Sequence, residues 1–133
     1  MVDGIDTVGD KVDLMEAAVR KDVPIRVSIL GAATRMDPLA LRIADLGSTT
    51  HCPLARAFRR GLAARGLREG ITCVYSVEAP RNAGMRPSVD EDLPDEQRQG
   101  LSPMGSMPCL PGIFGLAAAQ TVIARLLHDE APR

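Results

Sequence analysis

The sequence predicts a single α/β domain over residues 1–133, with helices packed on a mainly parallel sheet. Three observations predict this fold. The first residues have the pattern of a strand end followed by a helix, and PIRVSILG, residues 24–31, is a β-branched apolar run typical of a strand buried on both faces. Parallel strands joined by a helix form the right-handed crossover of α/β proteins. A chain of 133 residues with 45% hydrophobic content suffices for one core but not for two.

The segment VDGIDTV, residues 2–8, resembles the carboxyl end of a buried strand. Apolar residues then recur three and four positions apart, so we expect a helix over about residues 8–21. Thr7, followed three residues later by Asp10, is a weak form of the capping box. Ligands of α/β proteins gather at the carboxyl ends of the strands. The residues expected there are Asp3, Gly4, Asp6 and Gly31.

Two further strands and a second helix are expected in the middle of the chain. LALRIADL, residues 39–46, follows the turn-rich AATRMDP and predicts a strand, with an antiparallel direction among the options. Pro53 opens a stretch with one apolar stripe and Gly66 follows its last turn, which predicts a helix over residues 53–66. ITCVYSVE, residues 71–78, alternates regularly and predicts a strand.

The last third of the chain divides into a loop and a helix. Residues 79–105 collect prolines, glycines and the acidic run DEDLPDE, so we expect a mobile surface loop or lid. PGIFGLAAAQTVIARLL, residues 111–127, is apolar nearly all round, which predicts a buried or dimer-interface helix. It is shorter than the roughly eighteen residues needed to cross a bilayer and is interrupted by Gln120 and Arg125, so no membrane span is expected.

Composition narrows the function classes. The net charge of −1 gives no global field for nucleic acid or membranes, and an aromatic content of 2% argues against stacking platforms for single-stranded nucleic acid. The three cysteines form no C-x-x-C pair, so neither zinc nor a disulfide framework is expected. The first residues lack the pattern of a secretory leader, and a reducing cytoplasm fits best.

Asp6 and Lys11 are the first candidate site residues. Asp6 precedes the first helix, where a carboxylate is either a helix cap or a Mg²⁺ ligand beside the phosphates of a nucleotide. Lys11, five residues later, either binds the same phosphates or remains solvated. The residues alone leave both alternatives open.

Other candidates lie on the second helix and before the last one. Arg56, Arg59 and Arg60 are three and four residues apart, and form either a solvated face or a contact set for the phosphates of a nucleic-acid backbone. Cys109 lies in a glycine- and proline-rich turn and is either a small buried thiol or a covalent acceptor. His51 and His128 have no partner at catalytic spacing, so we expect structural or solvated roles for both.

Ordered segments over nearly the whole chain resemble one enzyme superfamily. They are DGIDTVGDKVDLMEAAVRKDVPI, GAATRMDPLALRIADL, CPLARAFRRGLAARGL, CVYSVEAPR and GSMPCLPGIFGLAAAQTVI. Together they resemble the C-terminal half of the ThiF-type, E1-like adenylating enzymes, and among these the tRNA threonylcarbamoyladenosine dehydratases most closely. The thiamine and molybdopterin adenylyltransferases usually hold zinc on two C-x-x-C pairs, which this chain lacks.

The resemblance implies a Rossmann-like, mostly parallel sheet that forms part of a ThiF domain. It implies that Asp6 helps to hold Mg²⁺ against ATP and that Lys11 matches the basic residue of the same motif. The implied reaction is ATP-dependent adenylation of a threonyl carboxylate on tRNA, followed by cyclisation. Arg56, Arg59 and Arg60 are then candidates for tRNA contact, in a cytoplasmic homodimer.

The family carries a glycine-rich ATP loop in its N-terminal half, and no G-x-G-x-x-G occurs in this sequence. We therefore expect a truncated domain that binds ATP and Mg²⁺ weakly or not at all and is inactive alone. Two alternatives remain open. One is a non-catalytic dimerisation or binding remnant, and the other is a ThiF-like sulfur-carrier adenylyltransferase that has lost its zinc.

Overall fold

The computed structural model describes residues 1–80 and 107–129, with side chains described to residue 127 in the last helix. Each helix and strand expected from the sequence within this range is present. In chain order the elements are β1 (Val2–Asp3), α1 (Val8–Arg20), β2 (Val27–Ile29), the 3-10 turn η1 (Pro38–Ala40), β3 (Leu41–Asp45), η2 (Leu46–Ser48), α2 (Pro53–Ala63), β4 (Thr72–Ser76) and α4 (Cys109–Asp129).

The four strands form one sheet in the order β1-β2-β4-β3. β2 pairs in parallel with β1 on one side and with β4 on the other, so that Val27 lies between Val2 and Thr72. β3 pairs antiparallel with β4, with Ile43 opposite Val74. The predicted mainly parallel sheet is confirmed, and the strand within residues 39–46 is antiparallel.

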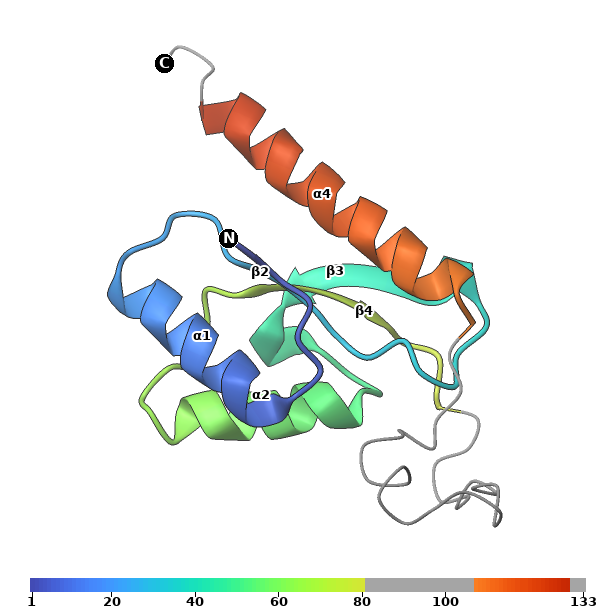
Figure 1. Cartoon of the computed structure of the whole chain (residues 1–133), viewed down its shortest axis with the longest axis horizontal. Coiled ribbons are helices and arrows are strands. Elements are labelled where there is room, and N and C mark those ends of the chain that lie inside the picture. The colour runs from blue at the N-terminus through green and yellow to red at the C-terminus, as the bar shows by residue number, and fades with distance from the viewer. Residues whose placement is uncertain (81–106, 130–133) are drawn as a thin grey trace, which may run out of the picture.

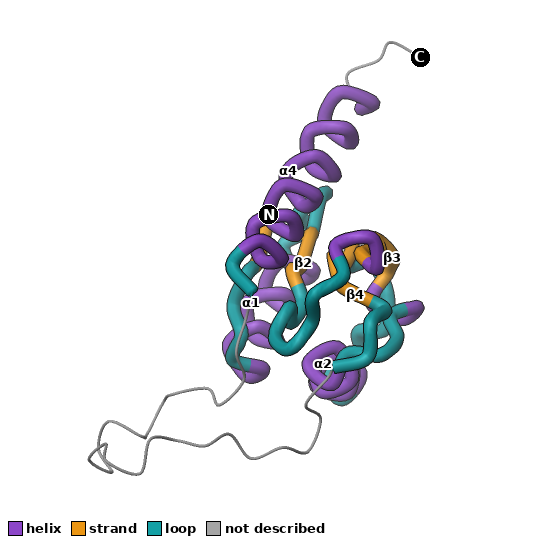
Figure 2. The backbone as a smooth tube through the Cα atoms, turned by 90° about the vertical axis from the view of Figure 1, so that its right-hand side faces the viewer, coloured by secondary structure: helices purple, strands orange, loops and turns teal. Residues whose placement is uncertain are grey.

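Helices cover both faces of the sheet. Figure 1 shows α1 and α2 together on one face and α4 on the other, and Figure 2 shows the same layers after a 90° turn. Alternate side chains of β4 supply the two cores. Cys73 and Tyr75 belong to the core under α1 and α2, whereas Val74 belongs to the core under α4.

α1 and α2 approach closely at Gly61. A Cβ at this glycine would lie 2.6 Å from Cγ2 of Val12, so the helix contact requires the absence of a side chain. Next to it, Glu16 of α1 accepts hydrogen bonds from Arg20 and from Arg65. The hydrogen bond from Arg20, and then that from Arg65, lowers the pKa of the Glu16 carboxyl below its usual value.

α4 packs on the sheet through one stripe. Phe114 and Ala118 are buried against Val27 and Val74. Beyond this contact the helix projects past the sheet, as Figure 1 shows. Its exposed apolar side chains are Leu116, Ile123, Leu126 and Leu127.

The structure corrects the length of this last helix. The sequence predicted residues 111–127, and the helix spans 21 residues, Cys109–Asp129. Its segment Cys109–Leu127 is long and apolar enough to cross a membrane by length and composition alone. Core helices of soluble proteins that pass the same test are mostly buried, whereas 17% of this segment is buried, so the predicted burial of the helix holds only for the stripe with Phe114 and Ala118.

The other two helices begin where the sequence predicts, at Val8 and at Pro53, although α2 ends at Ala63 and not at residue 66. Thr7 occupies the N-cap of α1, but its side chain makes no capping hydrogen bond, so the capping box with Asp10 is not formed. α2 is capped by Cys52, whose Sγ accepts from the Ala55 N–H at 3.4 Å. The loop predicted over residues 79–105 lies outside the described residues apart from its first two.

Candidate functional site

A pocket of about 470 Å³ opens at the carboxyl ends of β1 and β2. Because these strands are parallel, the loops that follow them meet at one edge of the sheet. We call this hollow the strand-end pocket, and its lining includes Gly4, Asp6, Gly31, Leu54 and Pro111. The predicted meeting of Gly4, Asp6 and Gly31 at this edge is confirmed, whereas Asp3, which was predicted there too, is buried at the end of β1 and does not line the pocket.

Asp6 is the acidic residue of the strand-end pocket. It is exposed and lies in the loop between β1 and α1, directly before the N-cap residue Thr7. Among the described residues, none forms a hydrogen bond or ion pair with its carboxylate. The carboxylate is therefore open to a ligand and lies beside the positive end of the α1 dipole.

Lys11 lies behind this pocket and not in it. Its Nζ donates to Asp3 Oδ2 at 2.6 Å, to Ser28 Oγ at 3.0 Å and to the Ile29 carbonyl at 3.0 Å. The side chains of Lys11 and Asp3 are both 0% exposed. An ammonium group has three N–H donors, and all three are used. The expectation that Lys11 binds phosphates is corrected, because a buried ion pair fully engages this ammonium.

The buried ion pair nevertheless supports the site. Oδ1 of Asp3 accepts from the Ile5 N–H at 2.8 Å, which fixes the loop that carries Asp6. On the other side, the Lys11 ammonium lies 5.6 Å from the centroid of the Phe58 ring on α2. The network thus joins β1, β2, α1 and α2 beneath the strand-end pocket.

The donors of the strand-end pocket fit a magnesium ion only together with a nucleotide. Asp6 is the one carboxylate among its lining residues, all of which are described. Within residues 1–80 and 107–129, no group of three His, Cys, Asp or Glu side chains that could hold a metal is found. Mg²⁺ commonly binds through one or two carboxylates, waters and substrate phosphates. A single carboxylate suits that mode and does not suit an ion bound by protein ligands alone.

The three arginines on α2 have different environments. Arg56 and Arg60 are exposed and line a hollow of about 410 Å³ beside His51. Arg59 is half-buried and donates to the carbonyl and hydroxyl oxygens of Thr49, which anchors α2 to the preceding loop. The candidate set for phosphate contact is therefore reduced from three arginines to Arg56 and Arg60.

The three cysteines are free and differ in exposure. Cys109 is exposed at the first residue of α4, so the expectation of a buried thiol is wrong there. Cys73 is buried on β4, and burial raises the pKa of its thiol to about 12. Cys52 is buried as the cap of α2. Thiolate chemistry among these residues is favoured only at Cys109.

Sequence reasoning missed a buried cation in the turn AATRMDP. Arg35 is 3% exposed. Its Nε donates to the Glu78 carbonyl at 3.0 Å, its Nη2 to the His51 carbonyl at 2.9 Å, and its Nη1 to the Gly31 carbonyl. The side chain thereby joins the loops after β2, before α2 and after β4. The sequence feature that could have indicated a buried arginine is its position among small residues directly after a buried strand.

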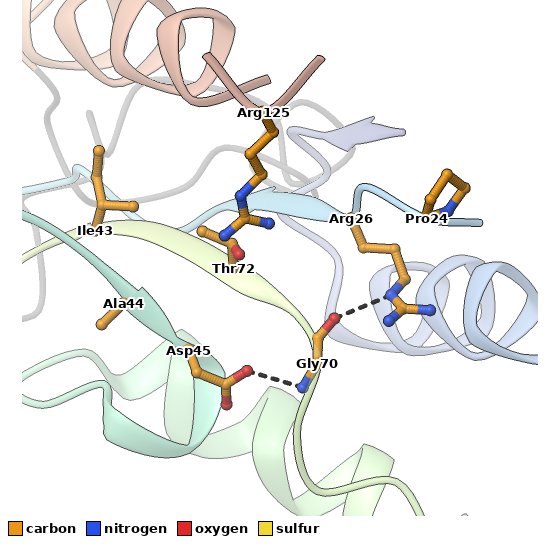
Figure 3. Close-up of a pocket in the computed structure, with 8 residues that line it drawn as sticks. All are labelled: Pro24, Arg26, Ile43, Ala44, Asp45, Gly70, Thr72 and Arg125. Atoms are coloured by element: carbon orange, nitrogen blue, oxygen red, sulfur yellow. Dashed lines mark hydrogen bonds between the residues drawn. The ribbon is translucent and has the colours of Figure 1, made fainter. Parts of the chain in front are cut away.

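A separate pocket of about 400 Å³ lies at the amino ends of β2 and β4. Figure 3 shows Arg125 reaching from α4 toward Thr72, and Arg26 donating to the Gly70 carbonyl at 2.9 Å. Asp45 accepts from the Gly70 N–H at 2.8 Å, so the carboxylate in this pocket is engaged by backbone. The pocket lies at the opposite end of the parallel strands and is not part of the candidate site.

The fold and the strand-end pocket define an α/β protein with a pocket at the carboxyl edge of its parallel strands, the place where nucleotide-binding α/β proteins hold their ligands. No family model matches the chain. It is 34% identical over 139 aligned residues to tRNA threonylcarbamoyladenosine dehydratase 2 of Saccharomyces cerevisiae. The alignment covers 95% of this chain and 30% of the yeast protein. It is 30% identical over 132 aligned residues to the tRNA threonylcarbamoyladenosine dehydratase of Bacillus subtilis. This alignment covers 97% of the chain and 51% of the bacterial protein.

The solved structures that the chain resembles belong to the same kind of enzyme as these relatives. The chain matches E. coli TcdA, a tRNA N6-threonylcarbamoyladenosine dehydratase, with a TM-score of 0.79 and 25% identity over 99% of this chain and 50% of TcdA. It matches TcdA in complex with AMP with a TM-score of 0.78 at the same identity. The chain spans 30–51% of the length of these relatives. Its predicted resemblance to part of an E1-like tRNA threonylcarbamoyladenosine dehydratase is confirmed.

Proposed function

We propose that the chain supplies the metal- and nucleotide-binding edge of an ATP-dependent tRNA threonylcarbamoyladenosine dehydratase. The observation that carries this proposal is the exposed, unpaired Asp6 in the strand-end pocket, next to the amino end of α1. E. coli TcdA has been crystallised with AMP and with ATP, which supports a nucleotide as the ligand. The chain's match to half of that protein supports a shared site but leaves the rest of the domain to another segment.

In this proposal Asp6 holds Mg²⁺ together with the nucleotide phosphates, and the buried Asp3–Lys11 pair keeps the Asp6 loop in place. When bound, Mg-ATP would supply the activation of a threonyl carboxylate by transfer of AMP with release of pyrophosphate, and ring closure would then expel AMP, so that the threonylcarbamoyl group loses one water overall. The residues of the chain bind and orient charged groups, and no strong base is required of them. The backbone N–H groups at the start of α1 add partial positive charge for an anion.

The second part of the proposal concerns tRNA. Arg56 and Arg60 project from the exposed face of α2 and flank the hollow beside His51. Guanidinium groups bind backbone phosphates without sequence preference, so they would position the tRNA and not read its bases. We propose a cytoplasmic location, in keeping with the tRNA-modifying role of the relatives.

Conversion of threonylcarbamoylated tRNA to its dehydrated form tests the activity. We expect no conversion by the chain alone, and conversion when it is joined to the half of the B. subtilis dehydratase that it does not match. Mass spectrometry of the tRNA nucleosides detects the loss of water. A joined protein that binds Mg-ATP but leaves the nucleoside unchanged would refute the proposed activity.

The exposed apolar face of α4 favours a second candidate function, self-association. Leu116 is 73% exposed and Leu127 is 64% exposed. Several large apolar side chains exposed along one helix face are characteristic of a protein–protein interface. We expect a homodimer by light scattering, and a monomer after Leu127→Lys. Arg125→Gln, at an exposed polar position on the opposite side of the same helix, is the control and should remain dimeric. A monomeric parent chain would refute this candidate and leave the first one intact.

A further inference from the structure

The pocket at the amino ends of β2 and β4 holds charged groups for which the proposed function has no use (Figure 3). We call this hollow of about 400 Å³ the amino-end pocket. Its charged lining residues are Arg26, Asp45 and Arg125, and Thr72 adds a hydroxyl group. These residues lie next to β2 and on β3, α4 and β4, so only the tertiary fold brings them together.

The pattern of α4 places Arg125 at this pocket. Phe114, Ala118 and Val122 form the stripe that packs on the sheet, and Arg125, three residues later, lies on the same side of the helix. An arginine therefore occupies the position at which the packing stripe would continue. Figure 3 shows its side chain reaching from α4 toward Thr72. Within the described residues its guanidinium forms no hydrogen bond or ion pair, so its five N–H donors are open to a ligand.

Thr72 is an independent indication of a ligand. The residue is only 8% exposed, and it precedes Val74 by two positions on β4, so its side chain faces α4. Its hydroxyl has no hydrogen-bond partner in the part of the chain that the structure describes. The one fully enclosed side-chain oxygen or nitrogen without a partner in that part is Oγ1 of Thr34. The Thr72 hydroxyl is therefore open to the pocket that its residue lines.

The carboxylate in the amino-end pocket neutralises neither arginine. Asp45 accepts from the backbone N–H groups of Gly47 at 2.9 Å, Gly70 at 2.8 Å and Ile71 at 3.2 Å, and it forms no ion pair with a described residue. Arg26 donates through Nε to the Gly70 carbonyl at 2.9 Å, and its two terminal nitrogens form no hydrogen bond within the described ranges. Two guanidinium groups and one carboxylate leave an excess of positive charge.

We propose that the amino-end pocket binds a phosphate group. Guanidinium N–H groups match phosphate oxygens, and Arg125 and Arg26 would supply both charge and donors. The Thr72 hydroxyl would donate to a further oxygen. Donors from three separate elements suit the tetrahedral oxygens of a phosphate better than the two coplanar oxygens of a carboxylate. The phosphate belongs either to a nucleic-acid backbone or to a small phosphorylated molecule, and the proposal stands independently of the strand-end pocket.

Amide chemical shifts of the full chain, followed by NMR during titration with inorganic phosphate, test this proposal. We expect saturable shifts at Arg26, at Asp45 and in residues 70–72. Sodium chloride at equal ionic strength should produce none of them, because screening by salt does not saturate a site. Dimethyl phosphate and ethyl phosphate then distinguish the source. Binding of the diester indicates a nucleic-acid backbone, binding of the monoester alone indicates a small phosphorylated molecule, and either result supports the site.

Three variants test the residues. Arg125→Gln should weaken phosphate binding roughly tenfold or more, as loss of a charge-assisted hydrogen bond does. Thr72→Val keeps the side-chain shape and removes the hydroxyl, so it should weaken binding roughly fivefold. Arg42→Gln is the matched control, because this exposed arginine on β3 lies opposite Tyr75 on the face of the sheet that α1 and α2 cover. It should bind phosphate as the parent does.

Three results would overturn the proposal. They are the absence of saturable shifts at the amino-end pocket, equal shifts with sodium chloride, and an Arg125→Gln chain that binds phosphate as tightly as the parent. A separate titration with Mg-ATP reports on the proposed function. Nucleotide shifts at Gly4–Asp6 belong to the strand-end pocket alone, because these residues do not line the amino-end pocket, so the failure of one proposal is distinguishable from the failure of the other.

Discussion

Replacement of Lys11 by methionine should strongly destabilise the chain. The change keeps the length of the side chain but removes the ammonium from a site in which both members of the ion pair are 0% exposed. The Asp3 carboxylate then stays buried with one charged donor fewer, and leaving a buried charge unpaired costs about 3–5 kcal/mol. A domain of this size has a total stability of about 5–15 kcal/mol, so Lys11→Met removes a large part of it.

Urea denaturation followed by circular dichroism measures this effect. A urea m-value of about 1–3 kcal/mol/M places the midpoint at least about 1 M below that of the parent. Lys21→Met, at an exposed lysine just after α1, is the matched control and should change the midpoint little. The double variant Asp3→Asn with Lys11→Met removes both charges and should be more stable than Lys11→Met alone. A Lys11→Met chain within about 1 kcal/mol of the parent would refute the reasoning.

Three further predictions concern the thiols, the helix contact and pH. A thiol reagent should label Cys109 rapidly and leave Cys73, whose pKa is raised to about 12, unlabelled in the folded chain; rapid labelling of both by mass spectrometry would contradict this. Gly61→Ala should cost about 1–3 kcal/mol in urea, because its Cβ would meet a valine methyl of α1, whereas the unhindered Gly9→Ala should not destabilise. Because the folded pKa of Glu16 is lowered, its stabilising contribution is present above its unfolded value of 4.5 and is lost as pH falls through the folded value. Glu16→Gln should therefore flatten the acid limb of the stability–pH curve, and an unchanged acid limb would rule out this contribution.

The sheet and helices could be predicted because the local pattern and the tertiary structure agree. The run at residues 24–31 is apolar at most positions because both of its faces are covered, one by α1 and α2 and the other by α4. The alternation at residues 71–78 marks the same two faces on β4. The meeting of Asp6 and Gly31 in one pocket follows from this order of elements, since parallel strands bring their carboxyl ends together.

The roles of single polar side chains could not be predicted in the same way. Lys11 and Asp6 are five residues apart, but only the tertiary structure shows that one is buried and the other exposed. Arg59 and Arg60 are adjacent on α2, yet the loop at Thr49 engages only the first. The partners of Arg35 come from three separate loops, so no local pattern marks them.

The location of a bound metal–nucleotide complex tests the central claim about the strand-end pocket most directly. Mn²⁺ with ATP broadens the NMR signals of amides near the metal, and we expect broadening at Gly4–Asp6 and at Gly31. Asp6→Asn should abolish it, whereas Asp10→Asn, at the exposed aspartate in the first turn of α1, should leave it unchanged. Broadening that survives Asp6→Asn, or that centres on residues outside the strand-end pocket, would contradict the account.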